Sequence, residues 1–511
     1  MLLQISYGIT VFIASACGLI IEIVAGRLLA PYVGMSLYTW TAIIAVVLLG
    51  LSIGHWIGGR LAAPHISSRQ SGYRIAVAFA LAAMTTLASL MLLRTIAGLL
   101  GSQSLSPIAV ILTLTTAVFL LPSLFVGIVT PMLTKLAIDN GSNDHGRVIG
   151  RMYALGTLGS IAGTLAAGYF FISWIGSTWT VIIVAVTYAI LAIFFAMNAI
   201  FRIAVIVAFI VTGAIFGAWG KKVQAFVSPC FVESDYFCIR VENYGPQSGR
   251  TSKLMVLDHL VHSINDQDDP RLLYSPYIHF VDEITQSRLG AKGLRRAFFI
   301  GGGGYTLPRA WAAGQSPPDM IVAEIDPMVT TVAQDQMWLS KSLPGLTIRH
   351  QDARLALKSL PQSKKFNVIF GDAFHDISVP THLVTFEFHE EVASRLNSNG
   401  FYIVNAVDHG QRPRFLLSLL KTLQKSFPVV EVWVEREEMD NPGRVTYSVV
   451  AGKVPSPSDL MFARRGFGRT WIRLPTEELA QKTAQLGALT LTDDYAPVDR
   501  LMMGVLTAPE K

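Results

Sequence analysis

Acidic side chains follow a run of glycines in the second half of this chain, at a spacing typical of nucleoside-binding sites. An apolar stretch at 298–300 leads into four consecutive glycines, Gly301, Gly302, Gly303 and Gly304. Glycines let a backbone approach a ligand and adopt positive φ angles that strain other residues. Glu324 follows about twenty positions later, and a carboxylate placed there accepts hydrogen bonds from ribose hydroxyls. The pairing predicts a nucleoside site.

The elements around this pair must bring further acidic groups to the same edge of a sheet. From residue 298 onward apolar strands alternate with helices, and the last two strands are expected at 429–435 and 444–452. This alternation predicts a parallel, doubly wound sheet with an antiparallel edge. In such sheets the ligand lies beyond the carboxyl ends of the strands, where the sequence supplies Glu324, Asp352, Asp372 and Asn405. We expect these groups to surround one pocket, because acidic side chains at the ends of successive strands are difficult to explain as ordinary solvent-exposed residues.

The first 220 residues have a different composition, with sparse charges between long apolar runs. The chain of 511 residues has a mean hydropathy of +0.46 and 15% charged residues, averaged over these unlike halves. Runs long enough to cross a bilayer, about 20 residues each, are expected at 5–30, 37–61, 75–100, 107–137, 152–175, 177–198 and 202–220. The sequence therefore predicts seven membrane spans and contact with a lipid bilayer.

The side of the membrane that the soluble half occupies stays open. Gaps on the side of the N-terminus contain more basic residues than the opposite gaps, which hold Arg27, Arg94, Lys221 and Lys222. This excess favours an N-terminus inside the cell and, with seven spans, a soluble half outside it. Nucleoside substrates are normally found inside, however, and one span more or fewer would reverse the result.

The remaining composition excludes some classes of protein and leaves smaller questions open. The net charge of +6 is scattered, and no basic stripe interleaved with aromatic residues indicates a nucleic-acid partner. No Cys/His spacing predicts a metal site. Cys230 and Cys238 are expected to be unlinked thiols, because an extended chain would hold them too far apart unless it bends. Glu22 and Arg27, at the first span, are either functional groups or an ion pair that fixes helix packing.

The order of motifs resembles the spermidine/spermine synthase family, the polyamine aminopropyltransferases. Its most specific portion is the glycine run followed by EID at 324–326, QDA at 351–353 and GDAF at 371–374. Residues 22–62 are similar to the first two spans of a multi-pass bacterial branch. The resemblance covers nearly the whole chain. It implies a membrane bundle at 1–220, a small β region at 221–285 and a Rossmann-like domain at 286–511.

The resemblance also implies roles for individual residues on the donor side of the site. The four glycines and Glu324 match the nucleoside-binding positions, with Glu324 on the ribose. Asp352 and the adjacent Ala353 match the positions near the adenine amino group. The donor would be decarboxylated S-adenosylmethionine, a co-substrate rather than a resident cofactor, and no metal is implied.

On the acceptor side, Asp372 matches the family's proton acceptor. Its expected role is chemically reasonable, because aminopropyl transfer from a sulfonium needs a deprotonated amine and a carboxylate that takes its proton. His262 matches a substrate-binding glutamine, Tyr277 a pocket tyrosine, and Asp376 is a further candidate for binding the cationic amine. Putrescine or a similar amine is the implied acceptor.

Two departures from the family keep other functions open, one in the glycine loop and one at 372–376, where DAFHD stands in place of the family's DSSDP and shifts the second acid by one position. Gly304 and Tyr305 stand where soluble members have an aspartate and a glycine, so a cationic substrate loses one carboxylate partner. One alternative is an S-adenosylmethionine-dependent methyltransferase, which uses a similar nucleoside site. Another is a transporter or sensor whose nucleoside domain regulates the bundle. The expected location is the inner cell membrane. The oligomeric state is open, with a homo-oligomer as one option.

Overall fold

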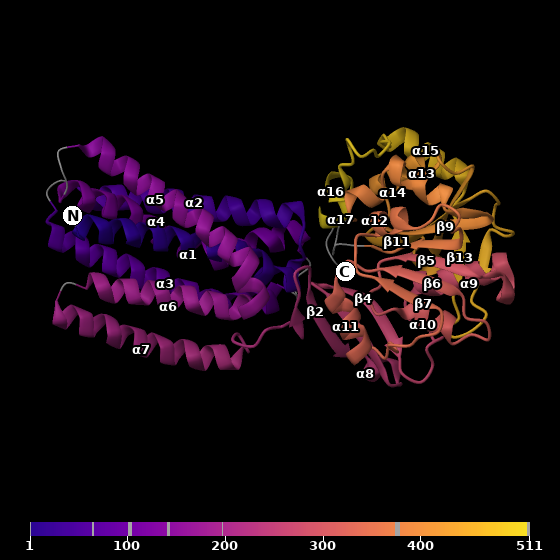
Figure 1. The fold of residues 1–511 in the computed structure, drawn as a ribbon, viewed down its shortest axis with the longest axis horizontal. Coiled ribbons are helices and arrows are strands. Elements are labelled where there is room, and N and C mark those ends of the chain that lie inside the picture. The colour runs from indigo at the N-terminus through magenta and orange to yellow at the C-terminus, as the bar shows by residue number, and fades with distance from the viewer. Residues whose placement is uncertain are drawn as a thin grey trace. The chain divides into compact units, whose positions relative to one another are not determined.

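A computed structural model describes residues 2–63, 66–100, 105–140, 144–196, 198–373 and 379–507 of the chain. The described chain forms two compact units, Met1–Cys238 and Ile239–Lys511. The first is a helical bundle, and the second contains mixed sheets covered by helices (Figure 1). This confirms the predicted fold class, a membrane-type bundle followed by an α/β domain.

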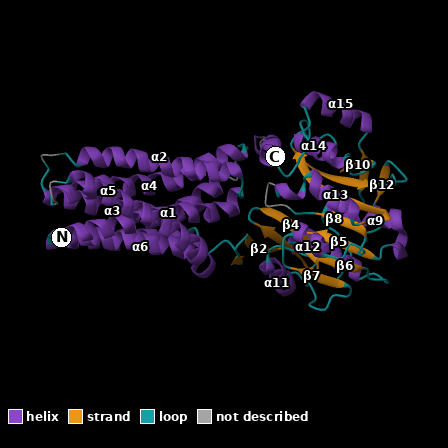
Figure 2. Ribbon diagram, turned by 45° about the horizontal axis from the view of Figure 1, so that its top comes forward, coloured by secondary structure: helices purple, strands orange, loops and turns teal. Residues whose placement is uncertain are grey.

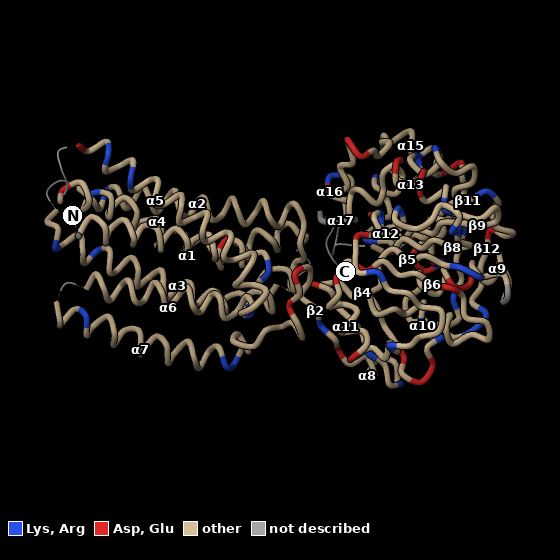
Figure 3. Tube along the Cα trace, in the orientation of Figure 1, with Lys and Arg blue, Asp and Glu red and all other residues tan. Residues whose placement is uncertain are grey.

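Within the described ranges, seven helices are long and apolar enough to cross a membrane, which agrees with the predicted number. In Figure 3 their long middle portions are almost free of charged residues. The helices are α1 (Leu2–Val33), α2 (Leu37–Leu61), α3 (Ser68–Leu100), α4 (Pro107–Asp139), α5 (His145–Ala166), which continues as a π-helical segment to Ile175, α6 (Ser177–Phe195) and α7 (Ala199–Lys222).

Small residues allow pairs of these helices to pack closely. A Cβ added to Gly54 of α2 would lie 2.2 Å from the carbonyl oxygen of Leu124 in α4, so only glycine fits. In α5, a Cβ added to Gly159 would lie 2.2 Å from the carbonyl oxygen of Phe12 in α1. A Cβ added to Gly163 would lie 2.2 Å from the carbonyl oxygen of Ala16. These glycines thus lie on helix-contact surfaces.

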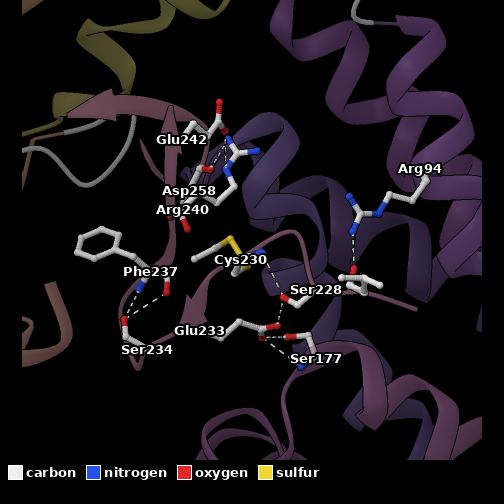
Figure 4. Close-up of a disulfide and its surroundings, with 12 residues drawn as sticks. Arg94, Ser177, Ser228, Cys230, Glu233, Ser234, Phe237, Arg240, Glu242 and Asp258 are labelled. Carbon is white, nitrogen blue, oxygen red and sulfur yellow. Dashed lines mark hydrogen bonds and ion pairs between the residues drawn. A yellow bond between two sulfur atoms is a disulfide. The ribbon is translucent and has the colours of Figure 1, made fainter. Parts of the chain in front are cut away.

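The connector after α7 corrects the expectation of two unlinked thiols, because Cys230 and Cys238 form a disulfide with 5.2 Å between their Cα atoms (Figure 4). The bend that makes this pairing possible is a turn in which the Ser234 N–H donates to the carbonyl of Phe237 at 2.9 Å. Glu233, in the short strand β1 (Val232–Glu233), accepts hydrogen bonds from both the N–H and the hydroxyl of Ser177. The connector is therefore tied to the bundle.

Arg27 contacts the same connector instead of forming an ion pair with Glu22. Its guanidinium donates to the carbonyl of Asp235. Arg94 of α3 donates to the carbonyl of Val227 at 2.7 Å. Both arginines thus secure the connector at one end of the bundle.

The second unit begins with an antiparallel meander of β2 (Cys238–Asn243), β3 (Ser252–Leu257) and β4 (Leu260–Asp266). The helix α9 (Pro276–Gly293) then leads to a large sheet, whose strands are orange in Figure 2. Among the described residues this sheet has nine strands in the order β12-β13-β10-β11-β9-β8-β5-β6-β7.

The large sheet has a parallel half and an antiparallel half. The parallel strands are β5 (Arg296–Ile300), β6 (Asp319–Ala323), β7 (Leu346–Arg349), β8 (Phe366–Gly371) and β9 (Leu396–His409). The antiparallel strands are β10 (Val429–Glu435), β11 (Arg444–Gly452), β12 (Leu460–Phe462) and β13 (Thr470–Arg473). The antiparallel portion is therefore larger than the single edge predicted from the sequence.

Helices connect the strands and cover the apolar core. They are α10 (Thr306–Ala312), α11 (Pro327–Gln336), α12 (Ala353–Ser359), α13 (Phe386–Ser394), α14 (Arg414–Leu423) and α15 (Thr476–Leu486). The core between the sheet and its helices includes Phe298, Ile369 and Phe388, each fully buried. β7 ends at Arg349, and the chain then turns to place Asp352 at the N-cap of α12.

Candidate functional site

The glycine run forms the turn between β5 and α10, where the chain needs backbone angles that favour glycine. Gly301 has φ +94°, and a Cβ there would lie 2.8 Å from the carbonyl oxygen of Asp372. Gly303 has φ +49°, with the hydroxyl of Ser263 2.9 Å from the position of an added Cβ. The glycine run therefore lies against the end of β8 and against β4.

Glu324 binds the backbone of this turn from the end of the neighbouring strand β6. Its Oε2 accepts a hydrogen bond from the Gly302 N–H at 2.8 Å, and its Oε1 accepts from the Asp326 N–H at 3.0 Å. Burial raises the pKa of Glu324, while these N–H donors act in the opposite direction. The structure thus places the predicted ribose carboxylate directly beside the predicted glycine loop.

Gly304 is held by side chains of β4 that the sequence interpretation missed. Its N–H donates to the Ser263 hydroxyl at 2.7 Å, and its carbonyl accepts from Asn265 Nδ2 at 2.7 Å. Asn265 also accepts a hydrogen bond from the Thr306 hydroxyl. The only sequence signal was their position two residues apart in the expected small β region at 221–285, since residues two apart on a strand point to the same face.

Tyr305 explains how the chain accommodates the departure from the family's glycine. It has φ +55°, in the left-handed region that the family's glycine would adopt freely. Its side chain is fully buried, and its hydroxyl lies 2.6 Å from that of Thr330 in α11. The Tyr305 ring thus packs against the glycine loop, and its hydroxyl forms a hydrogen bond with Thr330.

Asp372 follows β8 and is held by two neutral donors. Tyr277 at the start of α9 donates its hydroxyl hydrogen to Oδ2 at 3.2 Å, and Asn405 Nδ2 of β9 donates to Oδ1 at 2.8 Å. Burial raises the pKa of Asp372 to about 7, although the hydrogen bonds from Asn405 and Tyr277 lower it. Burial and the nearby Asp372 charge raise the pKa of Tyr277 well above its usual range. Asp372 is thus suited to exchange a proton near neutral pH.

Asp352 is at the corresponding end of β7, but both of its oxygens already have partners. Oδ1 caps α12 by accepting from the Leu355 N–H at 3.0 Å, and Oδ2 lies 2.7 Å from Nε2 of His382. The neighbouring Ala353 is buried in the core at the first turn of α12. The contact with His382 was not predicted.

The C-terminal segment also reaches this edge of the sheet. Arg354 forms a two-pronged ion pair with Asp493, both distances being 2.7 Å. Asp493 accepts a further hydrogen bond from Thr385 and donates its N–H to Glu387. The pair therefore brings the closing segment beside Asp352.

The other candidates are distributed as follows. His262 in β4 lies beside the glycine loop, where a Cβ added to Gly303 would be 3.9 Å from the His262 carbonyl oxygen. Asp376 falls outside the residues that the structure describes. In the described part of the chain, no group of three or more His, Cys, Asp or Glu side chains is arranged to hold a metal ion.

Comparison with known proteins supports the resemblance seen in the sequence. No protein-family model matches the chain. A stretch of 147 residues, 27% of this chain, is 31% identical to a Vibrio vulnificus protein named polyamine aminopropyltransferase and covers 46% of it. The chain thus spans less than half the length of this curated relative. The resemblance to the spermidine synthase family is confirmed, whereas the multi-pass membrane branch stays a prediction.

Solved structures with a similar arrangement include two spermidine synthases. A probable spermidine synthase from Corynebacterium glutamicum is 20% identical, with a TM-score of 0.44, over 52% of this chain and 97% of that chain. Spermidine synthase from Thermotoga maritima is 17% identical, with a TM-score of 0.33, over 40% of this chain and 67% of that chain. Similarity at this level does not support an argument about activity.

Proposed function

We propose that this protein is a membrane-bound polyamine aminopropyltransferase. It transfers an aminopropyl group from decarboxylated S-adenosylmethionine to putrescine or a similar amine and releases methylthioadenosine. The observation that supports this most strongly is Asp372, whose pKa is raised to about 7 beside the glycine loop. The 31% identity to a polyamine aminopropyltransferase supports the same reaction.

The reaction is an in-line displacement that needs little from the protein except position and one proton acceptor. The neutral amine nitrogen attacks the propyl carbon next to sulfur, a C–N bond forms, and the C–S bond breaks. The electron pair of that bond stays on sulfur, so the leaving group is a neutral sulfide. The proton lost by the amine passes to the Asp372 carboxylate, which Tyr277 and Asn405 orient.

The donor side of this proposal uses the glycine loop and Glu324. The ribose hydroxyls would bind at Glu324, which already receives the N–H groups of Gly302 and Asp326. The adenine would lie towards Asp352 and Ala353, with His262 and Tyr277 on the amine side. Asp376 is proposed as a further amine-binding group.

The seven apolar helices support a location in the inner cell membrane as a multi-pass protein in contact with lipid. The proposal includes no resident cofactor, no metal and no nucleic acid. Its place in metabolism would be polyamine biosynthesis.

A direct test uses the full chain purified in detergent. With decarboxylated S-adenosylmethionine and putrescine, methylthioadenosine should form in equal amount to the aminopropylated amine. Ordinary S-adenosylmethionine is the matched donor, because it differs only by the carboxylate. Tighter binding of the ordinary donor, with methyl transfer to an acceptor, would replace the proposal by a methyltransferase, the function that the change at Gly304 and Tyr305 leaves open.

A further inference from the structure

One end of the helical bundle holds the chain that leaves α7. Arg27 near the end of α1 and Arg94 near the end of α3 donate hydrogen bonds to backbone carbonyls of this connector, residues 223–238. Ser177, the first residue of α6, donates its N–H at 3.1 Å and its hydroxyl at 2.7 Å to the carboxylate of Glu233 (Figure 4). We call this end of the bundle, where α1 and α3 finish and α6 begins, the connector end.

The connector end also holds a disulfide bond, formed by Cys230 and Cys238. Polar contacts fold the chain around it, because the Ser228 hydroxyl donates to Glu233 at 3.0 Å and accepts from the Cys230 N–H at 3.2 Å. Cys238 is buried, so the bond is an internal part of the folded connector. Disulfides form and persist in oxidising compartments and are rare in the cytosol, where thiols are kept reduced. The disulfide therefore favours a connector end outside the cytoplasm.

The opposite end of the bundle contains the N-terminus. Gln4, in the first turn of α1, donates to the carbonyl of Ala137 near the end of α4 at 3.4 Å. Asn198, which caps α7, donates to the hydroxyl of Tyr73 near the start of α3 at 2.8 Å. The starts of α1, α3 and α7 and the end of α4 thus lie at this end, and α5 begins there after α4 has ended.

Basic residues are divided unevenly between the two ends, as Figure 3 shows for the bundle. The connector end has Lys221 and Lys222, together with Arg27 and Arg94, whose guanidinium groups bind the connector backbone. More basic residues lie near helix termini at the opposite end, and they are Arg60, Arg69, Arg74, Lys135, Arg147, Arg151 and Arg202. An excess of Lys and Arg beside membrane helices marks the cytoplasmic side. The charges therefore favour a cytoplasmic N-terminus, independently of the disulfide.

Exposed aromatic side chains at both ends support a bundle that crosses the bilayer. Trp56 near the end of α2 and Tyr153 near the start of α5 lie towards the N-terminal end. Trp174 and Trp179 lie at the connector end, on either side of the turn at Gly176. Indole and phenol rings concentrate at the two membrane–water interfaces. The two ends of the bundle thus fit opposite faces of the membrane.

We infer that the connector disulfide and the whole second unit lie outside the cytoplasm, whereas the N-terminus lies inside. The second unit begins at Ile239, directly after Cys238. All seven candidate membrane helices of the described chain end by Lys222, so no described helix returns the chain across the membrane. An odd number of spans also puts the two ends of the bundle segment on opposite faces.

This orientation defines the step that must precede the proposed reaction. For this step alone, the inference rests on the proposed aminopropyl transfer. The nucleoside donor is a sulfonium with an additional ammonium group, and moving such charges through an apolar layer is costly. A transport step must therefore bring the donor out of the cytoplasm, and methylthioadenosine and the aminopropylated amine are released on the outer side.

Cysteine labelling tests the orientation in intact spheroplasts. Lys453 in the second unit and His145 at the start of α5 are both exposed, and each is replaced by cysteine in the full chain. A membrane-impermeant maleimide should label Lys453→Cys before lysis and His145→Cys only after it. The wild type gives the background, because its free Cys17 is buried. Labelling of His145→Cys in intact spheroplasts, or protection of Lys453→Cys until lysis, would overturn the inference.

A count of free thiols needs no added cysteine. Cells are quenched in acid, the protein is denatured, and free thiols are modified with a maleimide polymer that slows migration in a gel. The wild type should show one free thiol, that of Cys17, and three after reduction. Cys230→Ser is the control, and it should show two thiols without reduction. Three free thiols in the unreduced wild type would place the connector in the cytosol and refute the inference.

The location of activity separates the orientation from the proposed reaction. Decarboxylated S-adenosylmethionine and putrescine are added outside spheroplasts that contain the wild type or Asp372→Asn, which controls for other enzymes of the cell. Intact spheroplasts with the wild type should release more methylthioadenosine than those with the variant. A difference that appears only after lysis would overturn the orientation. No difference before or after lysis would refute the proposed function, and the labelling and the thiol count would still decide the orientation.

Discussion

The hydroxyl of Tyr277 donates a hydrogen bond to the carboxylate of Asp372 at 3.2 Å, although 95 positions separate the two residues. The contact joins the first turn of α9 to the end of β8. It lies at the carboxyl edge of the parallel strands, where ligands of such sheets bind. Substitutions of Asp372 and of its contacts therefore test the proposed reaction most directly.

Replacing Asp372 by Asn should stop turnover while sparing donor binding. Asparagine has nearly the same shape but cannot take a proton from the amine, a role that contributes typically about 10²–10⁴-fold to a rate. Methylthioadenosine release measures the rate, and calorimetry measures donor affinity. An unchanged rate would remove Asp372 from the role of proton acceptor.

The rate should depend on pH through Asp372. Its pKa is raised to about 7 by burial, and only the ionised form accepts a proton, so the rate should rise as the pH increases through about 7. Tyr277→Phe removes a donor that stabilises the carboxylate, so this rise should move to higher pH. Tyr244→Phe is the control, because its ring packs on Tyr274 away from Asp372. A Tyr277→Phe profile identical to the wild type would contradict the assignment.

Asp372 should also make folding stability depend on pH. Because its pKa is raised from 3.8 to about 7 in the folded state, the folded protein binds this proton more tightly than the unfolded chain. Its stabilising contribution is present at low pH and is lost as the pH rises from about 4 to about 7. Asp372→Asn should therefore raise the unfolding temperature at pH 8 and leave it nearly unchanged at pH 4. An unfolding temperature of Asp372→Asn below that of the wild type at pH 8 would show that the Asp372 carboxylate is ionised in the folded protein throughout this pH range.

Gly301→Ala should lower activity by more than its backbone strain alone would explain. The new Cβ would lie 2.8 Å from the carbonyl oxygen of Asp372 at φ +94°. Gly249→Ala separates the two effects, since Gly249 has φ +68° but nothing within 4 Å of an added Cβ. Both variants should lose about 1 kcal/mol of stability from strain, whereas only Gly301→Ala should lower kcat/KM by about tenfold or more. Equal activity of the two variants would show that the loop tolerates the displacement.

Two substitutions of Asp352 distinguish its capping role from a role in binding. Asp352→Ala removes the cap on the Leu355 N–H and should cost about 1 kcal/mol of stability, whereas Asp352→Asn keeps a capping oxygen. Both should weaken binding of the nucleoside donor, because the carboxylate is lost. Donor affinity equal to wild type in Asp352→Asn would limit Asp352 to capping and to its contact with His382.

Several features were predictable because they depend on local patterns. The apolar runs have the length of a bilayer, so the sequence predicted seven spans, and the described residues contain seven helices long and apolar enough to cross a membrane. The strands with Glu324 and Asp372 at their ends also followed, because each is a short apolar run before a turn.

Other features were missed because they join distant parts of the chain. The bend at Ser234 brings Cys230 within disulfide distance of Cys238, and an extended strand did not predict that bend. Ser263 and Asn265 hold Gly304 from a separate sheet, with separations of 41 and 39 positions. Trp471 lies beside Glu435 through the pairing of β13 with β10 in the antiparallel half, which was expected to be smaller.

The sequence by itself determined the long apolar helices, the alternation of strands and helices, and the acids at the strand ends, since hydrophobic period and turn residues act over short distances. Only the tertiary structure decided which of those groups meet. Strand order placed Asn405 beside Asp372 and Ser448 beside Asn405. Burial among these partners, rather than any local motif, raises the pKa of Asp372 towards neutrality.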